Sequence, residues 1–170
     1  MQTGEQMYPV AAAIRMVKLA HGLSEADEIA LCGGDAVYTI KEENFSLELE
    51  PFADTGDLIK RKTEMLRVGV KSYRFYAETE FRADASLLAE FAEELNRLYE
   101  TLDGEAELEG DGCNRLKFKA MHDGHIFISG TLSMNENGQS YETTFYRSID
   151  QTFFRDFAKS LYRDYSATGY

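Results

Sequence analysis

The sequence predicts an α+β domain in which antiparallel strands surround two long amphipathic helices. Two segments, at about residues 84–102 and 151–164, carry apolar residues at helical spacing. Most of the remaining chain after residue 36 alternates apolar and polar residues, which is typical of half-buried strands. Short turns separate these strands, so neighbours are expected to be antiparallel. We expect about six to eight strands, in the order strands, central helix, three-stranded meander, C-terminal helix.

The chain of 170 residues is expected to form a single domain, because no Gly-, Ser- or Pro-rich linker divides it. Residues 36–165 are predicted to form the core. Residues 1–35 are interpreted as an N-terminal extension, with a possible helix at 9–21 that begins near Pro9. A strand in that segment stays open as an alternative.

The central helix is predicted from a stripe of apolar residues and from signals at both ends. The stripe consists of Leu88, Phe91, Leu95, Leu98 and Leu102. Asp84 can accept a hydrogen bond from a free amide of the first turn, and Gly104 can adopt the left-handed conformation after the last turn. The opposite face is acidic, and Glu93 and Arg97 are spaced for an i,i+4 ion pair.

The C-terminal helix is predicted to begin after Asp150, which can cap it. Its buried face is expected to carry Phe154, Phe157, Leu161 and Tyr165.

The first strands are predicted from two alternating stretches. Residues 37–40 and 45–49 form a hairpin around 42–44. Residues 66–70 and 73–81 follow, and the apolar parity changes between them, which predicts a tight turn or bulge at Lys71–Ser72. In this interpretation Tyr73 and Phe75 share a half-buried face with Ala77, Thr79 and Phe81.

The meander is predicted over residues 113–148. Residues 116–120 alternate toward Asp123–Gly124, a dipeptide that strongly favours a hairpin turn. The returning strand covers 126–134, and the sequence NENGQ then turns the chain into a third strand at 141–145.

The charge of the chain is strongly negative, at −12. Residues 84–112 hold ten acids and one base, Arg97, which gives −9. Such a surface disfavours nucleic acid and anionic membranes as partners and favours a basic one, although solubility alone would also explain it. No apolar run reaches the length of a membrane span, and two well-separated cysteines indicate a reducing cytoplasm.

No catalytic or cofactor-binding motif is present, so we expect neither an enzyme nor a cofactor. His122 and His125 flank the Asp123–Gly124 turn, and with Cys113 they are candidates for a metal site or an enzymatic centre. The alternative is an exposed turn in which the histidines need no role. The paired acids Glu48 with Glu50, and Glu78 with Glu80, are each predicted to share a sheet face. A solvated face explains them better than glycoside hydrolysis.

Residues 73–110 resemble the core of the WapI-like immunity protein family. In that family a strand leads into a helix with the pattern F-A-x-x-L-x-x-L-Y-x-x-L-x-G, here Phe91–Gly104, and a short strand follows, here Glu105–Leu108. The segments 124–130 and 148–161 also resemble the family, so the resemblance covers about residues 45–165. It implies a cytoplasmic immunity protein that binds and blocks a toxin domain.

The predicted partner is therefore a basic toxin domain. Its contact surface is predicted on the helix and on the strand that follows, at Glu90, Glu93, Glu94, Glu100, Glu105, Glu107 and Glu109. Two alternatives stay open: a metal-binding or enzymatic domain centred on Cys113, His122 and His125, and a scaffold that dimerises through a sheet edge.

Overall fold

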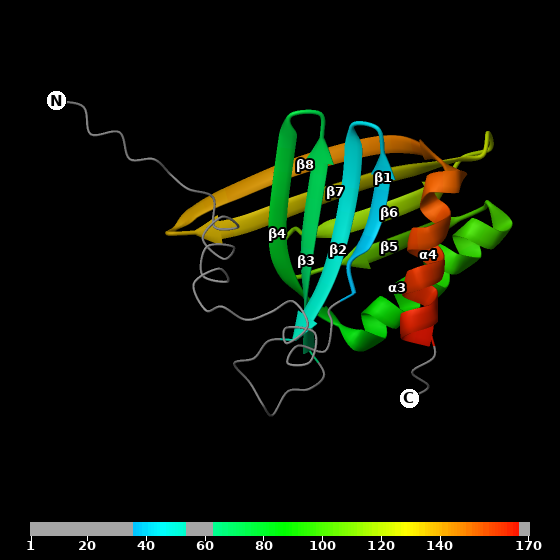
Figure 1. Cartoon of the computed structure of the whole chain (residues 1–170). Helices are drawn as coiled ribbons and strands as arrows, with labels where there is room; N and C mark the ends of the chain where they lie inside the picture. The colour runs from blue at the N-terminus through cyan, green and yellow to red at the C-terminus, as the bar shows by residue number, and fades with distance from the viewer. Residues whose placement is uncertain (1–35, 54–62, 167–170) are drawn as a thin grey trace, which may run out of the picture. The chain divides into compact units, whose positions relative to one another are not determined.

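The computed structural model describes residues 36–53 and 63–166 (Figure 1). The possible helix at residues 9–21 lies outside the described residues, and the single-domain organisation of the whole chain stays a prediction. Within the described part, eight strands form two antiparallel four-stranded sheets with two helices, which confirms the predicted α+β class.

The first sheet has the order β1-β2-β3-β4. Its strands are β1 (Tyr38–Glu42), β2 (Phe45–Ala53), β3 (Thr63–Ser72) and β4 (Phe75–Asp84). The predicted first hairpin is confirmed, since Glu42 pairs with Phe45 across a two-residue turn.

The second sheet has the order β5-β6-β7-β8. Its strands are β5 (Glu105–Glu109), β6 (Arg115–Ala120), β7 (His125–Glu136) and β8 (Gln139–Asp150). The last three strands are the predicted meander. The Asn137–Gly138 turn between β7 and β8 has positive φ at both residues, as this hairpin type requires.

The two helices are α3 (Ala85–Thr101) and α4 (Gln151–Ser166), which confirms the central and C-terminal helices. Asp84 accepts from the Ser86 amide at 3.3 Å and Asp150 accepts from the Thr152 amide at 2.8 Å, so both predicted caps form. The residue that closes α3 is Leu102 rather than Gly104: Leu102 adopts the left-handed conformation and donates to the Leu98 carbonyl at 2.9 Å. Neither helix is long and apolar enough to span a membrane.

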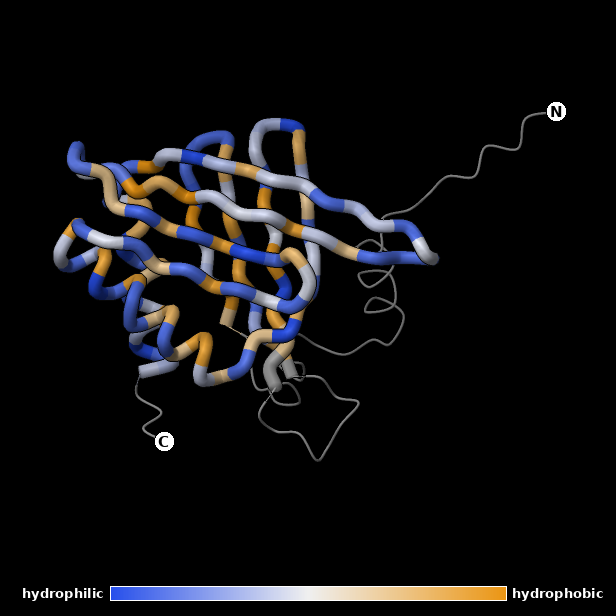
Figure 2. The backbone as a smooth tube through the Cα atoms, turned by 180° about the vertical axis from the view of Figure 1, so that it is seen from behind, coloured by the Kyte–Doolittle hydropathy of each residue, from blue (hydrophilic) through white to orange (hydrophobic). Residues whose placement is uncertain are grey.

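The core lies where the sheets and helices meet. In Figure 1 the strands of the two sheets cross, and α3 and α4 lie side by side; α3 contacts β5 and α4 contacts β1. At the centre the ring of Phe118 lies 5.7–5.8 Å from the rings of Phe91, Phe154 and Phe157. Figure 2 shows hydrophobic and hydrophilic residues alternating along the strands, as one buried and one solvated face require.

The turn between β3 and β4 differs from the prediction. Ser72 pairs with Phe75, so the turn is formed by Tyr73 and Arg74 and not by Lys71–Ser72. With a two-residue turn, Val70 pairs with Ala77 on the same face of the sheet. The turn alone therefore explains why the apolar residues change from even to odd positions, and no bulge is needed. Tyr73 and Phe75 lie at the tip of the hairpin and are exposed, not half-buried.

Candidate partner-binding surfaces

The outer face of α3 carries the uncompensated part of the predicted acidic surface. Burial of Leu88, Phe91 and Leu95 turns the glutamates between them toward solvent. Glu90 and Glu93 are exposed and form no ion pair with any other described residue. Arg97 does not form the predicted pair with Glu93; its Nη2 lies 4.0 Å from Oε1 of Glu94, one position further along the helix.

Glu100, at the other end of α3, forms an ion pair with α4. Lys159 of α4 donates to Oε1 of Glu100 at 2.7 Å and to Oδ1 of Asn96 at 2.9 Å. The hydrogen bond from Lys159 lowers the pKa of Glu100. This glutamate therefore contributes less free charge than its sequence suggests.

The glutamates of β5 face bases of β6. Ala106 and Leu108 are buried, so Glu105, Glu107 and Glu109 lie on the outer face of the second sheet. Nζ of Lys117 lies 3.0 Å from Glu105 and 3.7 Å from Glu107. The hydrogen bond from Lys117 lowers the pKa of Glu105.

A second base, Arg115, lies 3.4 Å from Glu107. Glu109 forms no ion pair within the described residues. The amide of Glu107 also donates to Glu94 at 3.4 Å, which joins β5 to α3. The seven predicted glutamates thus lie on adjoining elements, and among the described residues Glu90, Glu93 and Glu109 are the three of them that form no ion pair.

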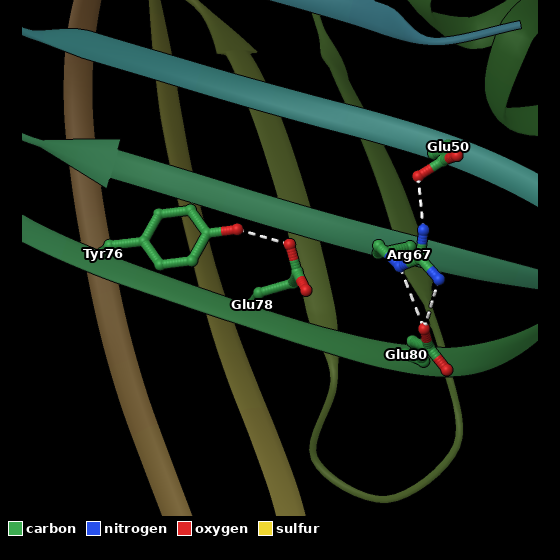
Figure 3. A network of polar contacts seen from close by, with 5 residues as sticks. All are labelled: Glu50, Arg67, Tyr76, Glu78 and Glu80. Atoms are coloured by element: carbon green, nitrogen blue, oxygen red, sulfur yellow. Dashed lines mark hydrogen bonds and ion pairs between the residues drawn. The ribbon is translucent and has the colours of Figure 1, made fainter. Parts of the chain in front are cut away.

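The outer face of the first sheet holds a polar network (Figure 3). Glu50, Arg67 and Glu80 lie opposite one another on β2, β3 and β4. Arg67 donates to Oε2 of Glu50 at 2.7 Å and to Oε1 of Glu80 from both Nε and Nη2. Partial burial opposes its charge, but the hydrogen bonds to Glu80 and Glu50 outweigh this effect and raise the pKa of Arg67.

The next row of this face contains the other two predicted acids, Glu48 and Glu78, with Gly69 between them. The Tyr76 hydroxyl donates to Glu78 (Figure 3). Partial burial and this hydrogen bond raise the pKa of Tyr76. Both predicted acid pairs therefore lie on one sheet face, where Arg67 compensates one member of each pair.

The histidine turn does not gather the predicted metal ligands. Nδ1 of His125 lies 3.2 Å from Oδ1 of Asp123, and the His125 amide donates to the same oxygen. The backbone hydrogen bond from His125 lowers the pKa of Asp123. Cys113 lies before β6 and the histidines after it, about 20 Å apart along six strand residues. Across residues 36–53 and 63–166, no three His, Cys, Asp or Glu side chains are grouped to hold a metal ion.

Two exposed aromatic features were not predicted. The first is a groove of about 510 Å³ on the outer face of the second sheet. The rings of Phe127 and Tyr146 stack in it, 6.3 Å apart, beside Arg115 and Lys117. The alternation of the strand could have predicted this ring, because Phe127 lies between the buried Ile126 and Ile128 and therefore faces outward.

The second feature is the tip of the β3–β4 hairpin, where Tyr73, Phe75 and Tyr76 are exposed. The sequence pattern did not predict this tip, because it placed Tyr73 in a strand. Tyr73–Arg74 contains neither the Gly nor the Asn that usually indicates a hairpin turn.

The family model described as the immunity protein WapI-like family matches residues 39–169 of the chain. No curated protein matches the chain significantly.

Solved structures similar to the chain share little sequence with it. WHY1 from Arabidopsis thaliana is 16% identical, with a TM-score of 0.47 over 75% of this chain and 81% of that one. The plant transcriptional regulator PBF-2 is 16% identical, with a TM-score of 0.45 over 75% and 79%. Trypanosoma bruciei MRP1/MRP2 is 12% identical, with a TM-score of 0.40 over 96% and 98%.

Proposed function

Because the chain belongs to the WapI-like immunity protein family, we propose that it is a non-enzymatic immunity protein that acts in the cytoplasm. It binds a cognate toxin domain and blocks it. The family match carries this proposal, since it extends from β1 to beyond the end of α4 and so includes nearly the whole described fold.

The proposed contact surface is the acidic outer face of α3, centred on Glu90 and Glu93 and extended by Glu109 of β5. None of these three carboxylates forms an ion pair with another described residue, so a partner can neutralise them without breaking one. Glu94, Glu100, Glu105 and Glu107 already face bases and belong to the margin of the surface. The complementary partner is a basic toxin domain, which an unpaired acidic surface attracts at long range.

The test is a binding experiment with the toxin domain encoded beside this gene. Glu90→Lys/Glu93→Lys is compared with Glu136→Lys/Glu142→Lys, which makes the same charge change at the exposed end of the β7–β8 hairpin. We expect the α3 variant to associate about tenfold or more slowly at low salt, and the control to change little. The difference should shrink at high salt, because exposed charges are then screened. Equal association rates for both variants would remove α3 from the interface, and no binding by the wild type would overturn the proposed function.

A further inference from the structure

The β3–β4 hairpin ends in three exposed aromatic residues within four positions. Tyr73 is 63% exposed, Phe75 83% and Tyr76 62%. Phe75 is the most exposed large apolar side chain in the described part of the chain. Single exposed apolar residues are common on protein surfaces, but clustered aromatic rings mark contact sites.

The backbone at this tip departs from what stability alone would select. Tyr73 has φ of 56°, a conformation that Gly or Asn adopts most readily. By comparison, the β7–β8 hairpin of the second sheet has Asn137–Gly138 in its turn. Tyr73 thus keeps an aromatic side chain at a turn position that other residue types adopt more readily, and this side chain also interacts with Arg147 of β8.

The rings surround the tip instead of forming one flat face. Phe75 has the same strand parity as Ala77, which is partly buried against the core, whereas Tyr76 lies on the opposite, outer face, where its hydroxyl donates to Glu78 (Figure 3). Tyr73 stands between them in the turn. A flat ligand or a membrane surface would contact only one of these faces, while a concave pocket that receives the tip contacts all three rings.

The charge at the tip is opposite to that of the whole chain. Lys41 and Lys71 both lie opposite Ser46, and Arg74 is in the turn. All three are exposed, and none forms an ion pair with another described residue. Glu43 of the adjoining β1–β2 turn is also exposed and unpaired, so these bases outnumber it three to one. The complementary surroundings of such a tip are therefore acidic.

We propose that the β3–β4 tip is a second docking element, which inserts its aromatic side chains into an apolar pocket with an acidic rim on the toxin domain. The inference rests on the proposed function for the identity of the partner, but it concerns another surface. The tip lies at the start of β4 and α3 begins at its end, ten residues and about 33 Å away. A globular domain of about 100 residues is wide enough to contact both surfaces.

The experiment compares Phe75→Ser with Tyr141→Ser, which removes another exposed ring (51%) from the β7–β8 hairpin of the second sheet. Calorimetry with the neighbouring toxin domain measures affinity, and chemical denaturation measures the stability of each variant. We expect Phe75→Ser to weaken binding about tenfold or more without changing stability, and Tyr141→Ser to stay within about twofold of the wild type. Lys71→Glu/Arg74→Glu should also weaken binding, and more strongly at low salt.

If the wild type binds the toxin domain and Phe75→Ser binds equally well, the inference is overturned and the proposed function stands. If the wild type does not bind the toxin domain, both the proposed function and this inference are overturned. Single-stranded DNA and anionic lipid vesicles are the remaining probes. Wild-type binding to either one, abolished by Phe75→Ser, would assign the tip to that ligand and overturn a protein pocket as its partner.

Discussion

Arg147 of β8 donates two hydrogen bonds to the Glu42 carboxylate of β1, at 3.0 Å from Nη2 and 3.3 Å from Nε. The two residues are 105 positions apart, and their ion pair joins an edge strand of the second sheet to an edge strand of the first. The hydrogen bond to Glu42 raises the pKa of Arg147, with a smaller contribution from Tyr73. The contact helps to fix how the two sheets meet.

Replacement of Glu42 by Gln should lower the free energy of unfolding by about 1 kcal/mol, because a partly buried charged pair becomes a weaker neutral contact. Glu43→Gln is the matched control. Glu43 is exposed, forms no ion pair with a described residue and should change stability by less than about 0.5 kcal/mol. Urea denaturation measures both, and equal stabilities would show that the Arg147–Glu42 pair contributes nothing.

Truncation of Phe118 to Ala should be far more damaging, at about 3–5 kcal/mol, because it opens a cavity among three neighbouring rings. The same truncation at Phe75 should cost less than about 0.5 kcal/mol, since that ring is exposed. Chemical denaturation midpoints of the two variants test this prediction. A clear loss of stability in Phe75→Ala would mean that the Phe75 ring stabilises the fold.

Addition of one methyl group at Gly110 should destabilise the chain by about 1–3 kcal/mol, because the new Cβ would lie 2.1 Å from the ring of Phe81. At Gly69 the nearest atom is 3.6 Å away, so Gly69→Ala should be tolerated. Thermal unfolding of the two variants tests this prediction. If both variants had the melting temperature of the wild type, the site around Gly110 would have space for a methyl group.

The cap of α4 should make stability depend on pH. The hydrogen bond from the Thr152 backbone amide lowers the pKa of Asp150 in the folded chain. A lowered folded-state pKa means that the stabilisation is complete above the unfolded value, near pH 4, and is lost as the pH falls through the folded value. Asp150→Ala should therefore be less stable than the wild type at pH 7, with the difference shrinking in acid. A difference that is constant between pH 7 and pH 2 would contradict this account.

Local pattern accounts for the elements of this fold. The apolar stripe and Asp84 placed the central helix at 84–102, and it occupies 85–101. Alternation likewise predicted the meander and the side on which Phe118 is buried. These features depend on neighbouring residues in the sequence, so a single sequence contains them.

Contacts between distant segments were not predictable in the same way. Nothing near Glu42 indicates Arg147, and nothing near Glu100 or Glu105 indicates that Lys159 and Lys117 neutralise them. The sequence located the acids but not their partners, so it overestimated the free acidic surface. The β3–β4 turn was misplaced for a different reason: Tyr73 adopts a conformation that its residue type seldom takes.

The most direct test of the central claim is the activity of the neighbouring toxin domain, measured during titration with the purified chain. An immunity protein of this family should abolish the activity at about one equivalent, as expected for a tight complex. Full toxin activity in the presence of excess chain would contradict the account.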